Sequence, residues 1–266
     1  MNHSVTRTAS GPAVQAQSSS LHGRVALVTG ASGSIGAEVA RALAARGAAV
    51  AVHGRTDSAL ECVVTGIRGA GGVAVAHVGD VRDAGHLQKV VADVTSTLGT
   101  IDVLVPCAGG AGMPTPTATL EPDRWREVIE TDLTSVFLTV QAALPGMLAL
   151  GHGRIVTVAS SAGRRPSQAN AAYAAAKAGV VMLTEHLAKE YAASGIRANC
   201  VAPAIVQTAT LRSRMSAAQL DAVATHVPLG RIGVPDDVAQ AVLFLTSDAS
   251  SFITGTTLDI TGGMTL

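Results

Sequence analysis

The sequence predicts an α/β protein with a doubly wound parallel sheet of about seven strands, helices on both faces, and a single domain. Short runs rich in β-branched residues alternate with stretches in which apolar residues recur every three to four positions, a pattern typical of right-handed βαβ units. A glycine-rich turn joins the first such run to the first helical stretch. The chain has 266 residues, 48% of them hydrophobic, so it can bury one large core.

Strands are expected where β-branched runs are bounded by turn residues. The segments that meet this condition are residues 25–29, 49–53, 73–78, 101–106, 154–160, 197–201 and 257–260.

Amphipathic helices are expected between these strands. One apolar face consists of Leu60, Val63, Val64 and Ile67. Glycines follow several helical stretches, where a left-handed residue commonly ends a helix; they are Gly47, Gly99 and Gly195. Pro235 with two aspartates after it indicates a helix start, because carboxylates suit the positive end of the helix dipole.

Composition excludes several classes of partner. Lys plus Arg and Asp plus Glu are balanced at 19 each, so we expect no nucleic acid and no membrane surface as a partner. No apolar run approaches the roughly 18 residues of a membrane span. The cysteines form no C-x-x-C pair and the histidines show no ligand spacing, so neither a disulfide framework nor a metal site is expected. We expect a cytoplasmic protein.

The first twenty residues differ from the rest. Residues 1–20 lack apolar periodicity and the apolar region of a signal peptide, so they are expected to be a disordered N-terminal tail. Residues 21–266 contain no linker and no internal repeat, and are expected to fold as one unit.

The glycine-rich turn, TGASGSIG at residues 29–36, follows the first strand and precedes a helix. Backbone N–H groups and the helix dipole at such a turn can bind a pyrophosphate. The turn therefore predicts a Rossmann-type fold with a dinucleotide at Gly30, Ser32, Gly33, Ser34, Ile35 and Gly36. A tight turn without a ligand is the alternative. A Gly-x-Ser-x-Gly nucleophile elbow, which would indicate a hydrolase, is absent.

In such a fold, the residues at the end of the second strand indicate which dinucleotide binds. A carboxylate there binds the ribose 2′-hydroxyl of NAD, but this chain has the sequence HGRT from His53 onward. The planar guanidinium of Arg55 suits a 2′-phosphate, so NADP(H) is expected in preference to NAD(H). A solvated surface arginine is the alternative. Asp80, directly after the third strand, is placed to contact the adenine, although an ordinary turn residue would occupy the same position.

Tyr173 and Lys177 lie in an alanine-rich helical stretch, four residues apart and therefore on one face. A free phenol loses its proton near pH 10, and a fixed cation nearby favours the phenolate. Such a pair also occurs by chance on helix surfaces. Its significance comes from Ser160, which is expected at the carboxyl end of a strand, where parallel sheets place their ligands.

Together the turn at residues 29–36, Ser160, Tyr173 and Lys177 resemble the short-chain dehydrogenase/reductase family, over roughly residues 23–264 and in its 3-oxoacyl-[acyl-carrier-protein]-reductase-like branch. The resemblance implies that Tyr173 protonates the carbonyl oxygen, that Ser160 hydrogen-bonds it, and that Lys177 tunes Tyr173 and holds the nicotinamide ribose. The Tyr-x-x-x-Lys spacing is that of carbonyl reducers in the family, whereas in enoyl reducers the two residues lie farther apart. Further cofactor contacts implied in this way are Val81, Ala108, Gly109, Pro203, Ile205, Val206 and Thr208.

The resemblance also implies a homotetramer, in which the helix at residues 170–194 and the helix near residues 125–144 form a two-fold interface. Substrate-binding walls are expected at residues 110–117 and 204–226. The substrate class is a small-molecule carbonyl or alcohol, and the sequence specifies no single compound.

Four residues depart from the family pattern. Ser34 replaces the middle glycine of the turn, Cys107 replaces an asparagine after the fourth strand, and Ala204 replaces a glycine after the sixth. Asp132 stands where the family has a catalytic asparagine. An ionised Asp132 can accept the same hydrogen bonds but cannot donate them; the alternative is that it pairs with Lys177 instead. The leading hypothesis is thus an NADP(H)-dependent oxidoreductase for a carbonyl/secondary alcohol pair. The alternative is a nucleotide-binding relative with weak or no catalysis.

Overall fold

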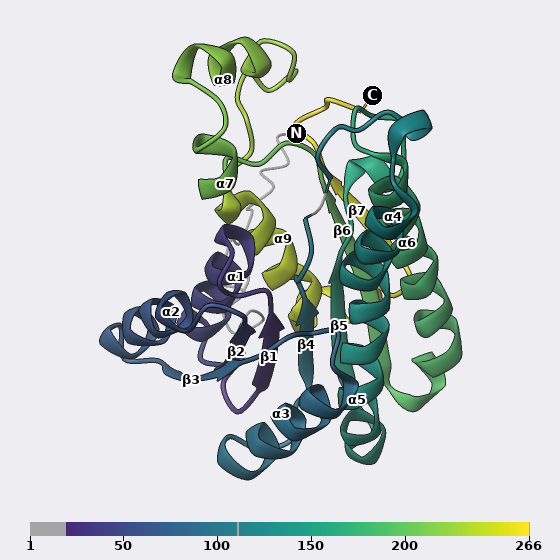
Figure 1. Ribbon diagram of the computed structural model, residues 1–266. Coiled ribbons are helices and arrows are strands. Elements are labelled where there is room, and N and C mark those ends of the chain that lie inside the picture. Colours follow the sequence, from purple (N-terminus) through teal and green to yellow (C-terminus); the bar gives the residue numbers. More distant parts are fainter. Residues whose placement is uncertain (1–19, 111, 266) are drawn as a thin grey trace, which may run out of the picture.

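The computed structural model describes residues 20–110 and 112–265, so the expected N-terminal tail lies outside the described residues apart from Ser20. In the described part, seven strands form one parallel sheet with the order β3-β2-β1-β4-β5-β6-β7 (Figure 1). This confirms the predicted fold class. The strands are β1 (Val25–Thr29), β2 (Ala49–Gly54), β3 (Val73–Val78), β4 (Val103–Pro106), β5 (Gly153–Val158), β6 (Ile196–Pro203) and β7 (Thr257–Ile260).

Four strands differ from their expected bounds; β2 and β6 are slightly longer than expected, and β4 and β5 are shorter. β4 begins at Val103 instead of residue 101, and the Asp102 carboxylate accepts the N–H of Val25 at 2.9 Å, so a side chain takes the place of a ladder carbonyl there. β5 ends at Val158, two residues before Ser160, because the chain turns into the 3₁₀ helix η4 (Ser161–Gly163).

The strand order reverses between β1 and β4. The chain builds β2 and β3 on one side of β1 and then returns to place β4 on the other side. Just past the two strand ends, the N–H of Cys107 donates to the carbonyl of Thr29 at 3.2 Å. In open parallel sheets, ligands bind outside the carboxyl ends of the strands at such a reversal.

One face of the sheet is covered by α1 (Ser34–Ala45), α2 (Asp57–Gly69) and α9 (Pro235–Thr246). Their apolar sides pack on the side chains of alternate strand residues, among them Val28, Val52 and Val105.

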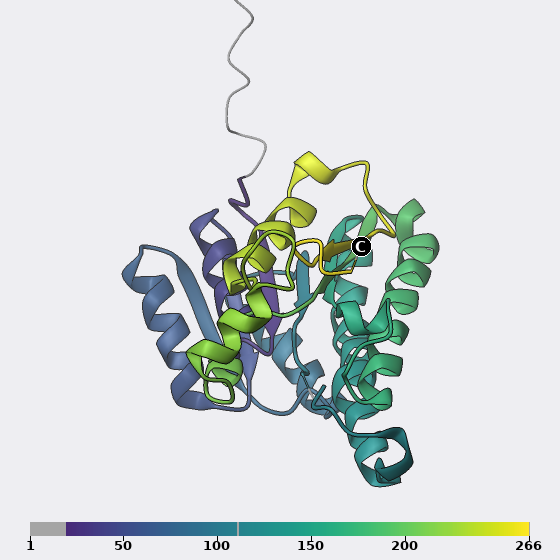
Figure 2. The same cartoon turned by 90° about the horizontal axis from the view of Figure 1, so that it is seen from above.

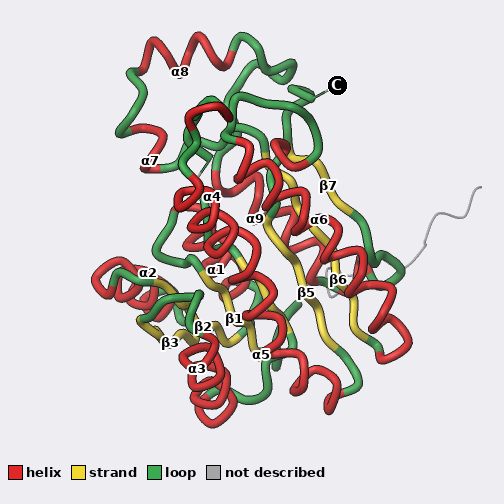
Figure 3. The backbone as a smooth tube through the Cα atoms, turned by 45° about the vertical axis from the view of Figure 1, so that its right-hand side comes forward, coloured by secondary structure: helices red, strands yellow, loops and turns green. Residues whose placement is uncertain are grey.

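The other face is covered by α3 (Ala84–Thr97), α5 (Ser135–Leu150) and α6 (Ala171–Tyr191) (Figure 3). These helices pack on a second core around Leu27 and Leu104. The helix α4 (Pro122–Ile129), the π-helical segment η3 (Glu130–Thr134) and α5 form one continuous helix. By length and hydropathy, residues Pro122–Leu150 meet the criteria for a membrane span. A core helix passes the same test, and residues such as Val140 and Met147 of this helix are buried against the sheet.

Two short helices, α7 (Ala209–Arg212) and α8 (Ala217–Ala224), rise beyond the carboxyl ends of the strands (Figures 1 and 2). The remaining short 3₁₀ helices are η2 (Thr117–Thr119), η5 (Ala192–Ser194) and η6 (Asp248–Ser250). The carboxyl ends of the strands, next to α7 and α8, are therefore the expected place for a site.

Candidate active site

The glycine-rich turn brings the backbone of β1 close to that of β4. Gly30 has φ +67°, and a Cβ at this position would lie 2.7 Å from the backbone nitrogen of Ala108. A Cβ on Gly36 would lie 2.5 Å from the carbonyl oxygen of Gly30. Both positions therefore require glycine. A hollow of about 610 Å³ lies beside the turn and is lined in part by Ser32, Gly33 and Ser34.

The N-terminus of α1 suits an anion. Gly33 is the N-cap and supplies no side chain, and the first turn of α1 contains no acidic residue. The first backbone N–H groups of a helix have no partner within the helix and carry partial positive charge. The turn therefore fits a pyrophosphate, as the sequence predicted.

Ser34 is accommodated without backbone strain. No non-glycine residue in the described part of the chain has a positive φ, so Ser34 fits where the family has glycine. Its Oγ accepts the backbone N–H of Ala209, the first residue of α7, at 3.0 Å. The substitution thus links the phosphate-binding turn to the segment over the strand ends.

At the end of β2, Arg55 is exposed to solvent. A Cβ on Gly54 would lie 2.7 Å from the Oγ of Ser32. Ser32 is therefore close to the end of β2, which Arg55 follows. The nearby Asp80 is bound by Arg82, with an Nη2–Oδ2 distance of 2.6 Å. This hydrogen bond is the main reason why the pKa of Asp80 falls to about 2, and Arg55 adds a smaller effect in the same direction. The Asp80 carboxylate is thus already engaged by arginine.

Lys177 lies at the centre of the site and is only 4% exposed. Its Nζ donates to the carbonyl of Val158 at 3.1 Å, lies 3.4 Å from the Oδ1 of Asp132, and lies 5.6 Å from the centre of the Tyr173 ring. Burial alone would lower the pKa of Lys177, but the neighbouring Tyr173 and Asp132 outweigh it and raise that pKa. The ammonium is therefore charged at neutral pH.

Asp132 is fully buried in the π-helical segment η3. Its Oδ1 accepts the backbone N–H of Gly110 at 2.7 Å. A π-helical turn inside a longer helix often marks a functional site. Gly109 has φ +134°, and a Cβ there would collide with the Asp132 carboxylate and lie 3.3 Å from the Lys177 Nζ. The pairing of Asp132 with Lys177 is one of the two possibilities that the sequence left open.

Ser160 lies just past β5 and begins η4. Its Oγ accepts the N–H of Ala162 at 3.2 Å, so the hydroxyl proton is left for another acceptor. A Cβ on Gly163 would lie 2.5 Å from the backbone of Lys177, so η4 and α6 are in close contact. Ser160 and Tyr173 are both partly exposed at this junction.

Asn170 is a residue that the sequence analysis missed. Its Oδ1 accepts the N–H of Tyr173 at 2.9 Å and caps α6, while its Nδ2 donates to the carbonyl of Met113 at 2.9 Å. A Cβ on Gly112 would lie 2.9 Å from the Tyr173 ring. Asparagine three residues before Tyr173 is an N-cap signal that could have identified it.

Comparison with known proteins agrees with this geometry. The profile of the family described as “Enoyl-(Acyl carrier protein) reductase” matches residues 30–265. Cis-4-hydroxycyclohexanecarboxylate dehydrogenase of Sinomonas cyclohexanicum is 43% identical over 242 residues, which cover 91% of this chain and 96% of that protein. This chain belongs to the short-chain dehydrogenase/reductase family.

The 3-oxoacyl-[acyl-carrier-protein] reductase of Escherichia coli (strain K12) is 37% identical over 242 residues, covering 91% of this chain and 97% of that protein. A gluconate 5-dehydrogenase from Burkholderia cenocepacia J2315, solved in complex with NADP and tartrate, has a TM-score of 0.87 and 34% identity, and the match covers 93% of this chain and 97% of that one. Relatives of this kind support the reductase-like branch. The protein is a hydride-transferring oxidoreductase that acts on CH–OH or C=O groups.

The other family positions also lie at the strand ends. Val81 is buried directly after Asp80, and Ala108 and Gly109 follow β4. Pro203 ends β6, and the next residues form the segment that leads to α7. In that segment Ile205 is partly exposed, Val206 forms a parallel bridge with Gly233, and Thr208 caps α7.

Cys107, where the family has asparagine, carries a thiol next to the Lys177 ammonium. Burial raises the pKa of Cys107 to about 12, although the nearby Lys177 opposes this shift. The thiol is protonated at neutral pH and does not act as a nucleophile. Among the described residues, no group of three His, Cys, Asp or Glu side chains could hold a metal ion.

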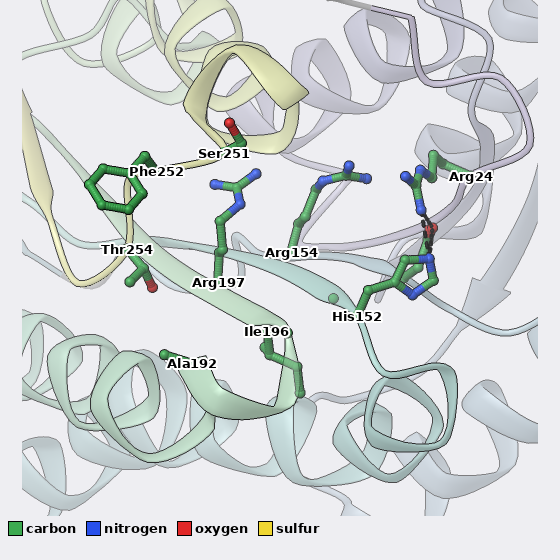
Figure 4. A pocket seen from close by; sticks show the side chains of 12 residues that line it. Arg24, His152, Arg154, Ala192, Ile196, Arg197, Ser251, Phe252 and Thr254 are labelled. Carbon is green, nitrogen blue, oxygen red and sulfur yellow. Dashed lines mark hydrogen bonds and ion pairs between the residues drawn. The ribbon is translucent and has the colours of Figure 1, made fainter.

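A second hollow, of about 550 Å³, lies at the opposite end of the sheet, where β5 and β6 begin (Figure 4). Arg154 and Arg197 project into it from these strands. Arg154 pairs with Asp248, and Arg197 donates to backbone carbonyls at and beyond the end of α9. These arginines join elements of the fold, and the hollow lies away from the catalytic groups.

Proposed function

We propose that this protein is a cytoplasmic, NADP(H)-dependent oxidoreductase that interconverts a ketone and a secondary alcohol. The observation that carries the proposal is the buried, charged Lys177 one turn from Tyr173, with Nζ 5.6 Å from the ring centre. A cation held in a site of low dielectric stabilises negative charge on a neighbouring oxygen, so Lys177 assists Tyr173 in exchanging a proton with a substrate oxygen.

Each catalytic residue has its own role in this proposal. Tyr173 donates its proton to the carbonyl oxygen in reduction and removes a proton from the alcohol in oxidation. Ser160 donates its remaining hydroxyl proton to the same oxygen and so orients the substrate. Lys177 stabilises the phenolate and is held in place by Val158. The nicotinamide, when bound, supplies or accepts the hydride.

Asp132 occupies the position of the family asparagine, but its hydrogen bonding and charge differ. It holds the loop at Gly110 and neutralises part of the charge of Lys177. A carboxylate accepts hydrogen bonds but cannot donate them. A water molecule held here can therefore only donate to Asp132, whereas the amide of the family asparagine can also donate to the water. We propose that Asp132 slows proton release from Tyr173 relative to an asparagine enzyme.

The preference for NADP(H) is proposed from Arg55. This residue is exposed at the end of β2, next to Ser32, and the chain offers no carboxylate there for a ribose 2′-hydroxyl. Asp80 lies close by but is neutralised by Arg82. The related gluconate 5-dehydrogenase was solved with NADP, in line with this assignment.

We propose a homotetramer with one interface formed by α4, α5 and α6. These helices expose large apolar side chains in the single chain: Trp125 is 40% exposed, Phe137 45% and Met182 62%. A face of this kind is typical of a subunit interface. Light scattering should therefore report about four times the 26.7 kDa chain mass, and a monomer mass at micromolar concentration would contradict the assembly.

The substrate is proposed to be a small hydroxy or oxo compound. Two relatives are named for hydroxy acids, 4-hydroxycyclohexanecarboxylate and gluconate, and one for a 3-oxoacyl thioester. The chain itself contributes Met113, Leu211 and Met215 to the expected substrate walls, which indicates a partly apolar pocket.

The test is a turnover screen with NADPH and with NADH. The carbonyl panel should include 4-oxocyclohexanecarboxylate and its methyl ester, 3-oxoacyl thioesters, oxidised sugar acids and simple ketones. We expect oxidation of NADPH with at least one of these compounds, faster than that of NADH. Saturable cofactor binding with no turnover across the panel would favour the second candidate, a nucleotide-binding protein in which the Asp132–Lys177 pair has suppressed catalysis.

A further inference from the structure

Arg214 bridges the two walls of the expected substrate cleft. It follows α7 in the segment over the strand ends, and its Nη1 donates to the sulfur of Met113 at 2.7 Å. Met113 belongs to the opposite wall, 101 residues away in the sequence. Both side chains are exposed, so the contact lies at the protein surface and not in the core.

The Met113 sulfur is a poor partner for a guanidinium. Arginine carries five N–H donors in a planar fork that matches a carboxylate, whereas a thioether is a weak acceptor. Among residues 20–110 and 112–265, no carboxylate lies within ion-pair distance of Arg214. A carboxylate that entered the cleft would therefore form a much stronger contact with this guanidinium than the sulfur does.

The contact also lies close to the chemistry. Gly112 packs against the Tyr173 ring, and the carbonyl of Met113 is held by Asn170, the residue that caps the helix of Tyr173. Arg214 is thus linked through one residue, Met113, to the backbone that borders the acid/base.

The charged residues near Arg214 leave its guanidinium available to bind an anion. The wall at residues 110–117 contains no charged side chain. Arg164, which follows η4, is held by Asp259 at 2.7 Å, so its guanidinium is already paired. The segment 204–226 contributes two arginines and one aspartate, Asp221, so its net charge is positive.

We propose that Arg214 binds the carboxylate of the substrate, which makes the substrate class an oxo acid and its hydroxy acid, with the carboxylate remote from the reacting carbon. The ketone or alcohol then lies at Tyr173, and the carboxylate replaces the Met113 sulfur as the partner of Arg214. This inference rests on the proposed function and adds the class of its substrate.

The experiment compares two ketones with the same ring, 4-oxocyclohexanecarboxylate, which is charged, and its methyl ester, which is neutral and one methyl group larger, with NADPH. In the parent enzyme, kcat/KM should be about tenfold higher for the acid, the usual size of a charge-assisted hydrogen bond at a partly solvated site. Arg214→Leu should remove this preference, mainly through a higher KM for the acid, and leave the ester unaffected. Arg214→Lys should retain part of the preference, because it keeps the charge but not the fork.

Arg126→Leu is the matched control, because Arg126 is an exposed arginine on α4 that pairs with Asp123 of the same helix. It should leave the ratio of the two ketones unchanged, and added salt should lower the ratio only in enzymes that retain a cation at residue 214.

Three results would overturn the inference and leave the proposed function intact: equal kcat/KM for acid and ester in the parent, turnover of other carbonyls with neither probe accepted, or an Arg214→Leu enzyme that loses activity equally on both probes. The last would mean that Arg214 only holds the two walls together. Absence of turnover with every carbonyl would overturn the proposed function itself, and this inference with it.

Discussion

The Oδ1 of Asp132 lies 3.4 Å from the Nζ of Lys177, and both side chains are almost completely buried. Removing two charges from water is costly, so a buried ion pair contributes little net stability unless hydrogen bonds satisfy its remaining atoms. Here Gly110 donates to Asp132, and Lys177 donates to Val158. The pair sets the net charge beside the acid/base Tyr173, so its main effect is on catalysis.

Asp132→Asn should raise kcat for alcohol oxidation near neutral pH and move the rising limb of the pH–rate profile, which reports the ionisation of the base, to lower pH. The asparagine oxygen still accepts the Gly110 N–H, but it no longer neutralises Lys177, so the ammonium acts more strongly on Tyr173. Steady-state rates between about pH 6 and 10 measure the effect. Superimposable profiles for parent and variant would refute this role, provided that thermal unfolding shows both to be folded.

Gly109→Ala should destabilise the domain and lower kcat, whereas Gly110→Ala should have the smaller effect. Both glycines have positive φ, so each alanine costs about 1–2 kcal/mol of backbone strain. Only the Cβ at residue 109 also collides with Asp132, while that at residue 110 has nothing within 4 Å. The difference between their unfolding free energies therefore measures the close packing around the ion pair. Equal losses would show that this packing contributes nothing.

Arg55→Ala should weaken NADPH binding by roughly ten- to a hundredfold and leave NADH binding nearly unchanged. The lost interaction is a charge-assisted, bidentate contact with a 2′-phosphate. Fluorescence titration of both cofactors measures it. The assignment is wrong if the two affinities fall together or if the parent prefers NADH.

His53 should make stability fall at acid pH. Burial, together with the neighbouring His86 and His77, lowers the pKa of His53 to about 4, and Asp80 opposes this shift only weakly. The unfolded chain takes up a proton on this histidine below about pH 6.5, and the folded protein does so only near pH 4. The unfolding free energy should therefore drop by up to about 3 kcal/mol as the pH falls through this window.

Urea unfolding at several pH values tests this dependence. His53→Gln should flatten it, and His186→Gln, at a 70% exposed side chain, should not. A parent enzyme whose stability is constant between pH 6.5 and 4 would contradict the role of His53.

The fold was largely predictable because its signals are local. The inner strands β1, β2, β4 and β5 are apolar runs that are almost completely buried, and the glycines of the turn are required by backbone contacts at Gly30 and Gly36. For Asp132 the sequence left two possibilities open, and the observed pairing with Lys177 is one of them. By contrast, the start of β4 depends on the Asp102 carboxylate, which binds the distant Val25, and the end of β5 depends on the η4 turn that follows it.

For the substrate-binding walls, the sequence predicted which segments form them but not which residues contact each other. The contact between Arg214 and Met113 joins residues about a hundred positions apart, and neither residue carries a spacing signal of its own. The π-helical register at Asp132 is likewise set by packing against α6 and by the Gly110 hydrogen bond, so periodicity alone predicts an ordinary helix there.

The most direct test of the proposed mechanism is the turnover of Tyr173→Phe with its preferred carbonyl and NADPH. The phenylalanine ring keeps its place beside Lys177 and removes only the hydroxyl. The account predicts a fall in kcat of at least about 10²-fold, the contribution of a general acid, with NADPH affinity unchanged at the separate glycine-rich turn. A Tyr173→Phe enzyme that turns over near the parent rate would contradict it.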